Sequence, residues 1–274
     1  MTQNKPVPQQ LSVTRRLFRW TLRGLVLLLA LLAGPLMMAA CSGIQSQQNW
    51  YDTDRSSAKI APLPSAAEEA IVQVYHARAF GWRGYFAVHT WLATKEKGAN
   101  SYWVHDVTGW RQRTMRSYAA EPDTAWYGNP PTLIADIRGP QAEVAIPKIL
   151  AAGQAYPYAD RYQAWPGPNS NTFTSWVIRQ VPELSVALPN TAIGKDYLGP
   201  RLVATTPSNS GLQLSLLGYA GVLASVREGI ELNLLGLSLG VDPIALGIKL
   251  PGIGELSLLE PWQPDSTTHT ANAE

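Results

Sequence analysis

The first apolar segment of the chain is a run of leucines and alanines that follows a basic stretch. RRLFRWTLR (15–23) precedes GLVLLLALLAGPLMMAAC (24–41). The apolar run from Leu25 to Ala40 is shorter than the roughly 20 residues that a membrane-spanning helix needs. Its length and its basic flank are typical of a signal peptide. We therefore predict that residues 1–40 are a signal or anchor segment.

Residues 41–68 are a polar stretch with scattered proline and serine, which we interpret as a tether and an entry into the folded body. Three later segments, 70–80, 84–94 and 101–110, have the β-branched and aromatic composition of strands. The second of these is apolar on both alternating faces. This pattern predicts a central strand that is covered from both sides.

Helical spacing of apolar positions begins further along the chain. Residues 133–155 follow this spacing, with Ile146 and Ile149 on one face. Residues 172–181 are predicted to form a second helix that ends before Pro182, because proline does not continue a helix. The two segments predict helices that pack on the sheet.

Leucine and glycine dominate residues 201–262, where apolar and polar positions alternate. We interpret this part as β-hairpins with glycine turns, and residues 263–274 as a disordered tail. The apolar content indicates a face covered by the main body, by another copy or by lipid. The expected fold class is α+β: an antiparallel sheet with packed helices over 69–200, followed by the Leu- and Gly-rich hairpins.

Composition and charge narrow the function. Hydrophobic residues make up 46% of the 274 positions and charged residues 15%, so the chain is not of a disordered class and can bury a core. The net charge of +2 is misleading, because five of the 22 basic residues and none of the 20 acidic residues lie in the first forty positions. The remaining chain is slightly acidic, and no basic patch suggests a nucleic-acid partner.

Cys41 is the only cysteine, and it follows the small residues Ala39 and Ala40. This ending resembles a bacterial lipoprotein signal, in which the cysteine becomes lipidated. We therefore predict a membrane-anchored lipoprotein on the extracytoplasmic or periplasmic side, with an uncleaved anchor or ordinary secretion as alternatives. An internal disulfide, a thiolate metal cluster and a cysteine nucleophile in the body are excluded.

Ser170 is the candidate nucleophile, because it lies at the start of the second predicted helix. A helix N-terminus offers N–H groups and partial positive charge to an oxyanion, here near Asn169, Asn171 and Thr172. A serine hydroxyl needs an adjacent base, and His89 in the central strand is the best candidate.

The base itself needs a third group that orients the imidazole. Asp106, on the next predicted strand, is the candidate for this role. Its neighbour His105 is expected to point to the other face, because side chains alternate along a strand.

Structural roles are the alternative explanation for the presence of the same residues. Asn, Ser and Asp are preferred helix caps, so capping alone accounts for the run before the helix. His89 fits a core histidine, and Asp106 fits a strand-edge carboxylate. His76, His89 and His105 on successive strands suggest a metal site, but no His-x-His or HExxH spacing supports one. We predict no metal and no cofactor.

Five blocks of the chain resemble one bacterial family of uncharacterised function, domain of unknown function 3750. The blocks are 51–62, 74–91, 156–173, 191–198 and the ending 233–256. The similarity covers nearly everything from Trp50 to Leu259. The resemblance implies membership of that family but no activity.

A more distant likeness concerns circularly permuted papain-like proteins, the NlpC-like and lecithin:retinol acyltransferase-like groups. In those groups a strand histidine precedes a nucleophile that opens a helix in an Asn-Cys-x-x-Phe motif. Here His89 corresponds to that histidine, and Ser170 stands at the cysteine position before Phe173. The resemblance implies a permuted papain-like core, either as a Ser–His variant or as a scaffold that binds without reacting.

Two functions follow from these predictions. The first is hydrolysis or acyl transfer on an envelope amide or ester, in peptidoglycan or lipid. Ser170 would attack, His89 would take the proton and Asp106 would hold His89. The second is a non-catalytic envelope protein that binds glycan, peptide or lipid through the same cleft, with the apolar C-terminal strands as a docking surface.

Overall fold

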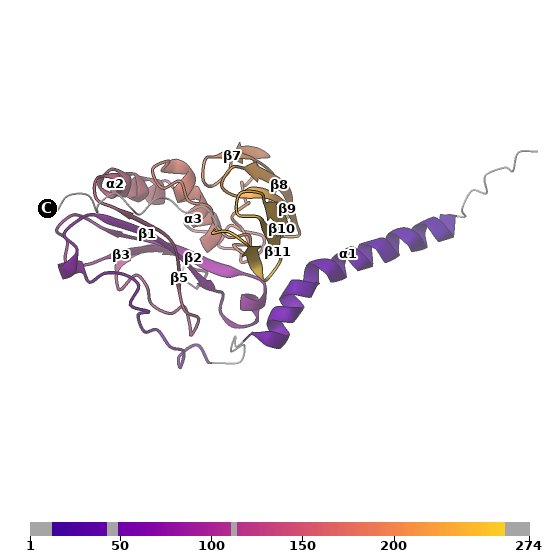
Figure 1. Cartoon of the computed structure of the whole chain (residues 1–274), viewed down its shortest axis with the longest axis horizontal. Coiled ribbons are helices and arrows are strands. Elements are labelled where there is room, and N and C mark those ends of the chain that lie inside the picture. Colours follow the sequence, from indigo (N-terminus) through magenta and orange to yellow (C-terminus); the bar gives the residue numbers. More distant parts are fainter. Residues whose placement is uncertain (1–12, 43–48, 111–113, 261–274) are drawn as a thin grey trace, which may run out of the picture.

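The computed structural model describes residues 13–42, 49–110 and 114–260, which form two antiparallel sheets and the helices around them (Figure 1). The predicted α+β class with C-terminal hairpins is confirmed. The predicted disordered tail, 263–274, lies outside the described residues.

The first sheet has five strands in the order β4-β3-β2-β1-β5, all of them antiparallel to their neighbours. Its central strand is β2, as the apolar pattern predicted. The strands are β1 (Ile71–Arg78), β2 (Val88–Lys95), β3 (Trp103–Val107), β4 (Met115–Ala119) and β5 (Thr132–Arg138).

The helical prediction for 133–155 is wrong in its first part, because Thr132–Arg138 forms β5 and pairs with β1. The helix α2 starts only at Pro140 and ends at Gln154. Gly139 separates the two elements with a φ of 63°, a conformation that glycine adopts readily. Proline then suits the first helical position. The segment before β2 also differs, since Gly81–Tyr85 is a 3₁₀ helix, η2.

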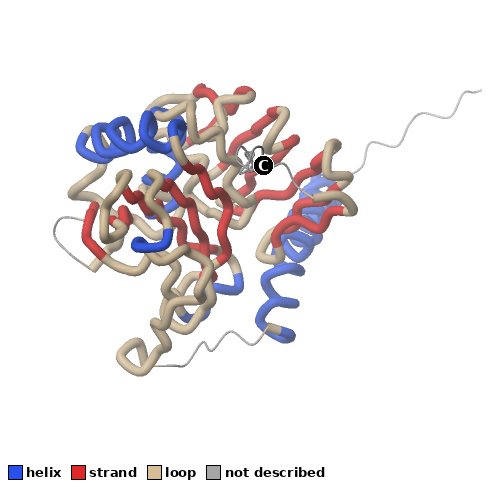
Figure 2. Tube along the Cα trace, turned by 60° about the vertical axis from the view of Figure 1, so that its left-hand side comes forward, coloured by secondary structure: helices blue, strands red, loops and turns tan. Residues whose placement is uncertain are grey.

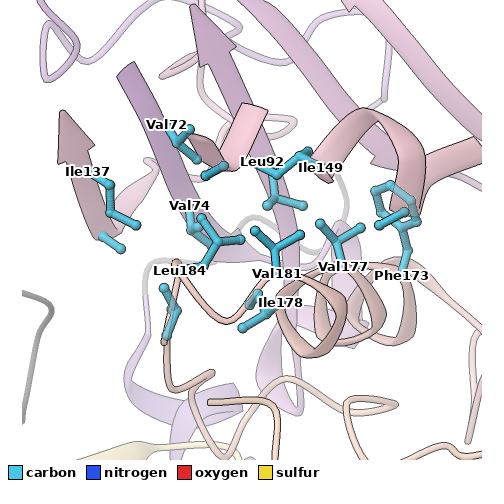
Figure 3. Packing of buried hydrophobic residues seen from close by; sticks show 14 of the residues in the cluster. Val72, Val74, Leu92, Ile137, Ile149, Phe173, Val177, Ile178, Val181 and Leu184 are labelled. Carbon is cyan, nitrogen blue, oxygen red and sulfur yellow. The ribbon is translucent and has the colours of Figure 1, made fainter. Parts of the chain in front are cut away.

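Helices α2 and α3 (Ser170–Gln180) cover one face of this sheet, and the main core lies between these helices and the sheet (Figures 1 and 3). In Figure 3 Phe173, Val177 and Ile178 of α3 point toward Val74 and Leu92 of the sheet. All five side chains are fully buried or nearly so. The helix predicted over 172–181 therefore does pack on the sheet.

The opposite face of the same sheet carries a second, aromatic cluster. Tyr75 and Trp91 stack with ring centroids 5.6 Å apart, and Trp126 and Leu133 pack against them. The Trp91 indole donates a hydrogen bond to the Pro122 carbonyl at 2.8 Å. Both faces of β2 are thus buried, which the apolar character of 84–94 predicted.

The C-terminal part forms a second sheet of seven strands in the order β12-β11-β10-β9-β8-β7-β6, joined by hairpins. Successive side chains along each of its strands point to opposite faces of the sheet. The strands are β6 (Val203–Thr205), β7 (Gly211–Leu216), β8 (Ala220–Ser225), β9 (Gly229–Leu234), β10 (Leu237–Asp242), β11 (Gly247–Leu250) and β12 (Gly254–Ser257).

The inner face of the second sheet is polar and is joined to the body by buried ion pairs. Lys195 Nζ lies 2.6 Å from one oxygen of Glu231, and Lys249 Nζ lies 2.9 Å from the other. Burial raises the pKa of Glu231, but the two ammonium groups outweigh it and lower that pKa below its ordinary value. Asn233 donates to Asp196 at 3.1 Å in the same layer.

The N-terminal helix α1 (Val13–Cys41) projects from the body in Figure 1, and in Figure 2 it is the long helix at the right-hand edge, where strands overlap it. By length and composition it is the one described helix that could cross a membrane. Residues 13–30 are exposed, whereas Leu31, Gly34 and Pro35 are buried against the body. A Cβ atom on Gly34 would collide with the Pro251 carbonyl in the turn between β11 and β12.

Candidate functional site

A cavity of about 690 Å³ lies at the start of β2, where the body, α1 and the second sheet meet. Residues from α1, η2, the start of α3 and the turn between β9 and β10 contribute to its wall. The lining includes Leu28, Leu32, Phe80, Trp110, Trp126 and Leu235. His89, Asn169, Ser170 and Asn171 also line it, so four of the predicted site residues share one cavity.

Asn169 caps α3, which places Ser170 at the first helical position. The Asn169 side-chain oxygen accepts hydrogen bonds from the Asn171 and Thr172 N–H groups at 3.0 and 3.1 Å. The Thr172 hydroxyl in turn accepts from the Asn169 N–H at 3.1 Å, which completes a capping box. Two of the N–H groups predicted for an oxyanion are thus already satisfied by the cap.

Asn171 fastens the start of α3 to the central strand. Its side-chain oxygen accepts from the Thr90 hydroxyl at 3.0 Å, and its amide donates to the Val88 carbonyl at 2.9 Å. The Asn169 and Asn171 amides both donate to the Ile193 carbonyl. Because these buried amides are satisfied, they hold the end of α3 in a fixed position beside the cavity.

His89 lies flat against Trp126, with ring centroids 3.6 Å apart and planes inclined by 9°. Its Nε2 atom is buried and has no hydrogen-bond partner among the described residues. Burial, helped by the positive charge of Arg116, lowers the pKa of His89 to about 3. The imidazole is therefore neutral at physiological pH.

His89 and Ser170 belong to opposite sides of the central strand. His89 has the strand parity of Trp91 and stacks with it in the aromatic cluster, whereas α3 packs on the face that contains Val88 and Leu92. The cavity reaches both residues because it lies at the end of the strand. No hydrogen bond joins the two side chains among the described residues.

Asp106 forms an ion pair with Arg116, and the Arg116 Nε donates to it at 2.8 Å. The second bond of this bidentate pair, from the Arg116 Nη2, is also formed. The carboxylate shares the sheet face of His89 but is not hydrogen-bonded to it within the described chain. The catalytic roles of Ser170, His89 and Asp106 stay predictions.

The other two strand histidines are separate from the cavity lining. His105 is buried between the Thr94 and Ser117 hydroxyls, at 2.9 and 2.8 Å, and burial lowers its pKa to about 4. Burial, and then the charge of Arg78, lower the pKa of His76 to about 4. Within the described residues, no group of three or more His, Cys, Asp or Glu side chains could hold a metal ion.

Comparison with known proteins identifies one family. Residues 69–197 match the family described as "Protein of unknown function (DUF3750)". No curated protein and no solved structure matches the chain. The match supports the resemblance found in the sequence, and it contains β1 to α3 with His89, Asp106 and Ser170.

Several cavity residues lie far in sequence from the motifs that pointed to it. Trp110 and Trp126, inside the matched DUF3750 region, form an aromatic wall with ring centroids 6.5 Å apart. Leu28 and Leu32 of α1 and Leu235 of the second sheet lie outside that region. The abundance of tryptophan was the available signal, but composition does not say which tryptophans meet.

Proposed function

We propose that the protein is a membrane-attached envelope protein that binds the apolar part of an envelope lipid in this cavity without reacting with it. The observation that carries the proposal is the cavity wall. It combines aromatic rings of the body with two leucines of the apolar helix α1. If α1 lies in a membrane, a ligand that enters the cavity beside Leu28 and Leu32 comes from the lipid around this helix.

The size and chemistry of the cavity suit such a ligand. Its volume of about 690 Å³ lies within the range of small-molecule sites, which are mostly apolar with a few polar groups. Arg83, in η2, lines it and is exposed. A guanidinium there would pair with an acidic headgroup, while neutral His89 and the aromatic rings would contact the chain.

The distribution of charge along α1 suggests that the body of the protein lies outside the cytoplasm. Four arginines lie in α1 before its apolar part and none follows within the helix. Basic residues stay on the cytoplasmic side of a membrane helix, so the body would lie on the other side. We propose that α1 is retained as an anchor, because cleavage before Cys41 would remove Leu28 and Leu32 from the cavity.

Lipidation at Cys41 is the competing anchor. The cysteine is exposed at the end of α1, where it is free of a disulfide. The two possibilities predict different masses for the mature chain, and intact-mass spectrometry separates them. A Cys41→Ser variant that keeps its membrane retention supports the retained helix, whereas release from the membrane supports the lipid.

A photoactivatable phospholipid tests the binding proposal. Full-length protein in vesicles that contain a diazirine-labelled acyl chain should crosslink at peptides that line the cavity. Ala164→Trp places a bulky side chain in the lining at an exposed loop position and should abolish this crosslinking. Ala151→Trp, at an exposed position of α2, is the matched control. Equal crosslinking of both variants would exclude the cavity as the lipid site.

Ser–His chemistry is the second candidate, favoured by one observation: Ser170 and His89 line the same cavity. In this scheme Ser170 Oγ attacks the carbonyl carbon of an envelope amide or ester, and His89 accepts the hydroxyl proton while Asp106 orients the imidazole. The bond to the amine or alcohol breaks as His89 passes the proton to that leaving group, and water or a second alcohol then releases the acyl group from Ser170. It takes second place because a histidine with a pKa of about 3 is a weak base at neutral pH. Arg116 also competes with His89 for the Asp106 carboxylate, because the two residues already form an ion pair.

A fluorophosphonate probe decides between the two candidates. Covalent labelling of the wild type that is lost in Ser170→Ala would establish Ser170 as a nucleophile. The binding proposal predicts no labelling of either protein. Labelling that persists in Ser170→Ala would come from another residue and would reject the Ser170 scheme.

A further inference from the structure

The outer face of the seven-stranded sheet reverses the usual distribution of polar and apolar residues. Register places Leu214 of β7 opposite Val203 of β6 and Val222 of β8, and Val222 opposite Leu232 of β9. Leu239 of β10 continues this row from Leu232. An apolar row therefore crosses five strands side by side.

A second apolar row crosses the other half of the sheet. Ile230 of β9 faces Val241 of β10, which faces Ile248 of β11, and Ile248 faces Leu256 of β12. These four side chains are each exposed over 45–52% of their surface. No charged residue occupies an outward position on the described strands of this sheet, whereas Glu231 and Lys249 point inward.

Exposed leucines continue the apolar surface into the turns. Leu217, Leu235 and Leu246 have φ angles of 50–54° and are exposed. Turns of this conformation usually select asparagine, aspartate or glycine, because bulky residues rarely adopt positive φ. Apolar surface on this scale marks a protein or membrane contact.

We propose that this outer face rests on a lipid bilayer, so that the second sheet is a membrane-contact surface in addition to the anchor helix. The position of α1 selects lipid as the occupant. The helix leaves the body beside the β11–β12 turn, where Gly34 contacts Pro251 and Pro35 contacts Gly252. In Figure 1 the C-terminal strands lie on the side of the body from which the free part of α1 extends.

The buried part of α1 strengthens this choice. Leu31, Gly34 and Pro35 lie within the apolar stretch of the helix, yet they pack on the body. Insertion of the exposed apolar residues before Leu31 brings the neighbouring turns of the body to the membrane surface. The adjacent outer face, without outward charges on its strands, can then bury its leucines in the apolar boundary of the bilayer.

The test uses full-length protein with Cys41→Ser, so that one introduced cysteine carries an environment-sensitive NBD label. Leu214→Cys and Ile248→Cys report on the outer face, and Leu27→Cys reports on insertion of α1. Lys97→Cys, in the exposed turn after β2, is the control. Each protein is reconstituted into phosphatidylcholine and phosphatidylglycerol vesicles, with or without doxyl-labelled lipid.

Contact with lipid predicts blue-shifted NBD emission at both outer-face positions and loss of most of it when doxyl lipid is present. The Lys97→Cys label should keep its emission. Quenching at Leu27→Cys without quenching at the outer face would overturn the inference while leaving the anchor in place. A blue shift that lipid does not quench, and that grows with protein density, would instead show that a second copy covers the face.

Folding of each labelled protein is checked by near-UV circular dichroism. Val222→Cys, in the middle of the same apolar row, provides an independent position should Leu214→Cys not fold. The lipid crosslinking of the cavity is a separate measurement. Failure of the cavity proposal therefore leaves the outer-face result intact, and the reverse also holds.

Discussion

The two sheets of this protein differ in the side chains that they bury and expose. The five-stranded sheet has both faces covered, and its largest buried side chains are mostly apolar or aromatic. The seven-stranded sheet buries ion pairs and amides on its inner face and exposes leucine, isoleucine and valine on its outer face. Alternation of polar and apolar residues along a strand therefore does not by itself say which face of the sheet is buried.

The largest expected effect comes from the buried ion network beneath the second sheet. Glu231→Gln removes the charge shared by Lys195 and Lys249. It leaves these buried ammonium groups only their longer ion pairs, with Asp196 at 3.4 Å and with Glu255 at 3.6 Å. Removing one partner of such a pair costs about 3–5 kcal/mol. Chemical unfolding in nonionic detergent, followed by circular dichroism, measures this loss.

The control for that variant is Lys148→Met, which breaks the half-exposed ion pair with Glu183. Exposed pairs contribute about 0–1 kcal/mol, so this change should be small. Equal losses in the two variants would mean that the buried network is not what joins the second sheet to the body.

Identical leucine truncations compare the two sheets directly. Leu92→Ala removes a fully buried side chain between β2 and the helices, and such changes cost about 2–5 kcal/mol. Leu214→Ala, on the outer face, should change the unfolding free energy in detergent by less than about 0.5 kcal/mol. A large effect of Leu214→Ala would indicate that protein covers this position.

Glycine substitutions in α1 test its packing on the body. Gly34→Ala places a methyl group against the Pro251 carbonyl, whereas Gly24→Ala meets nothing within 4 Å. Overpacking costs about 1–3 kcal/mol, so Gly34→Ala should loosen the helix from the β11–β12 turn. Hydrogen exchange at residues 251–253 should accelerate in Gly34→Ala only, and equal rates in both variants would contradict the contact.

Lowering the pH should also destabilise the protein. Burial lowers the pKa of His89 to about 3 and those of His76 and His105 to about 4, from 6.5. Between these values the unfolded chain binds more protons than the folded one, so stability falls as pH drops below 6.5. The melting temperature should be lower at about pH 5 than at about pH 7.5.

The His89→Gln variant should lose part of that dependence, because it removes one of the three groups that titrate differently in the two states. Above about pH 6.5 the melting temperatures of the variant and of the wild type should both be independent of pH. A wild-type melting temperature that stays constant between about pH 5 and 7.5 would contradict the burial of neutral histidines.

Local patterns predicted most of the elements but not their arrangement. The apolar character of 84–94 gave the central strand, and the stretch 172–181 before Pro182 gave the helix that packs on it. The strand before Pro140 was missed, because Leu133 and Ile137 also fit helical spacing. Only pairing with β1, which is distant in sequence, distinguishes the two conformations.

The candidate site was predictable only in part. Motif reasoning led to His89, Asn169, Ser170 and Asn171, which do line one cavity. The pairing of Asp106 with Arg116, and the stacking of His89 on Trp126, arise from contacts across strands and loops. No spacing within the chain encodes such contacts, so the sequence could name four of the cavity residues but not their partners.

Native mass spectrometry of the full-length protein, released from nonionic detergent, measures directly whether the cavity binds lipid. Lipid binding in the cavity predicts a bound lipid on the wild type and on Ala151→Trp, and its loss in Ala164→Trp. A wild-type protein that carries no lipid after extraction from native membranes, or an Ala164→Trp variant that retains as much as the wild type, would contradict lipid binding in the cavity.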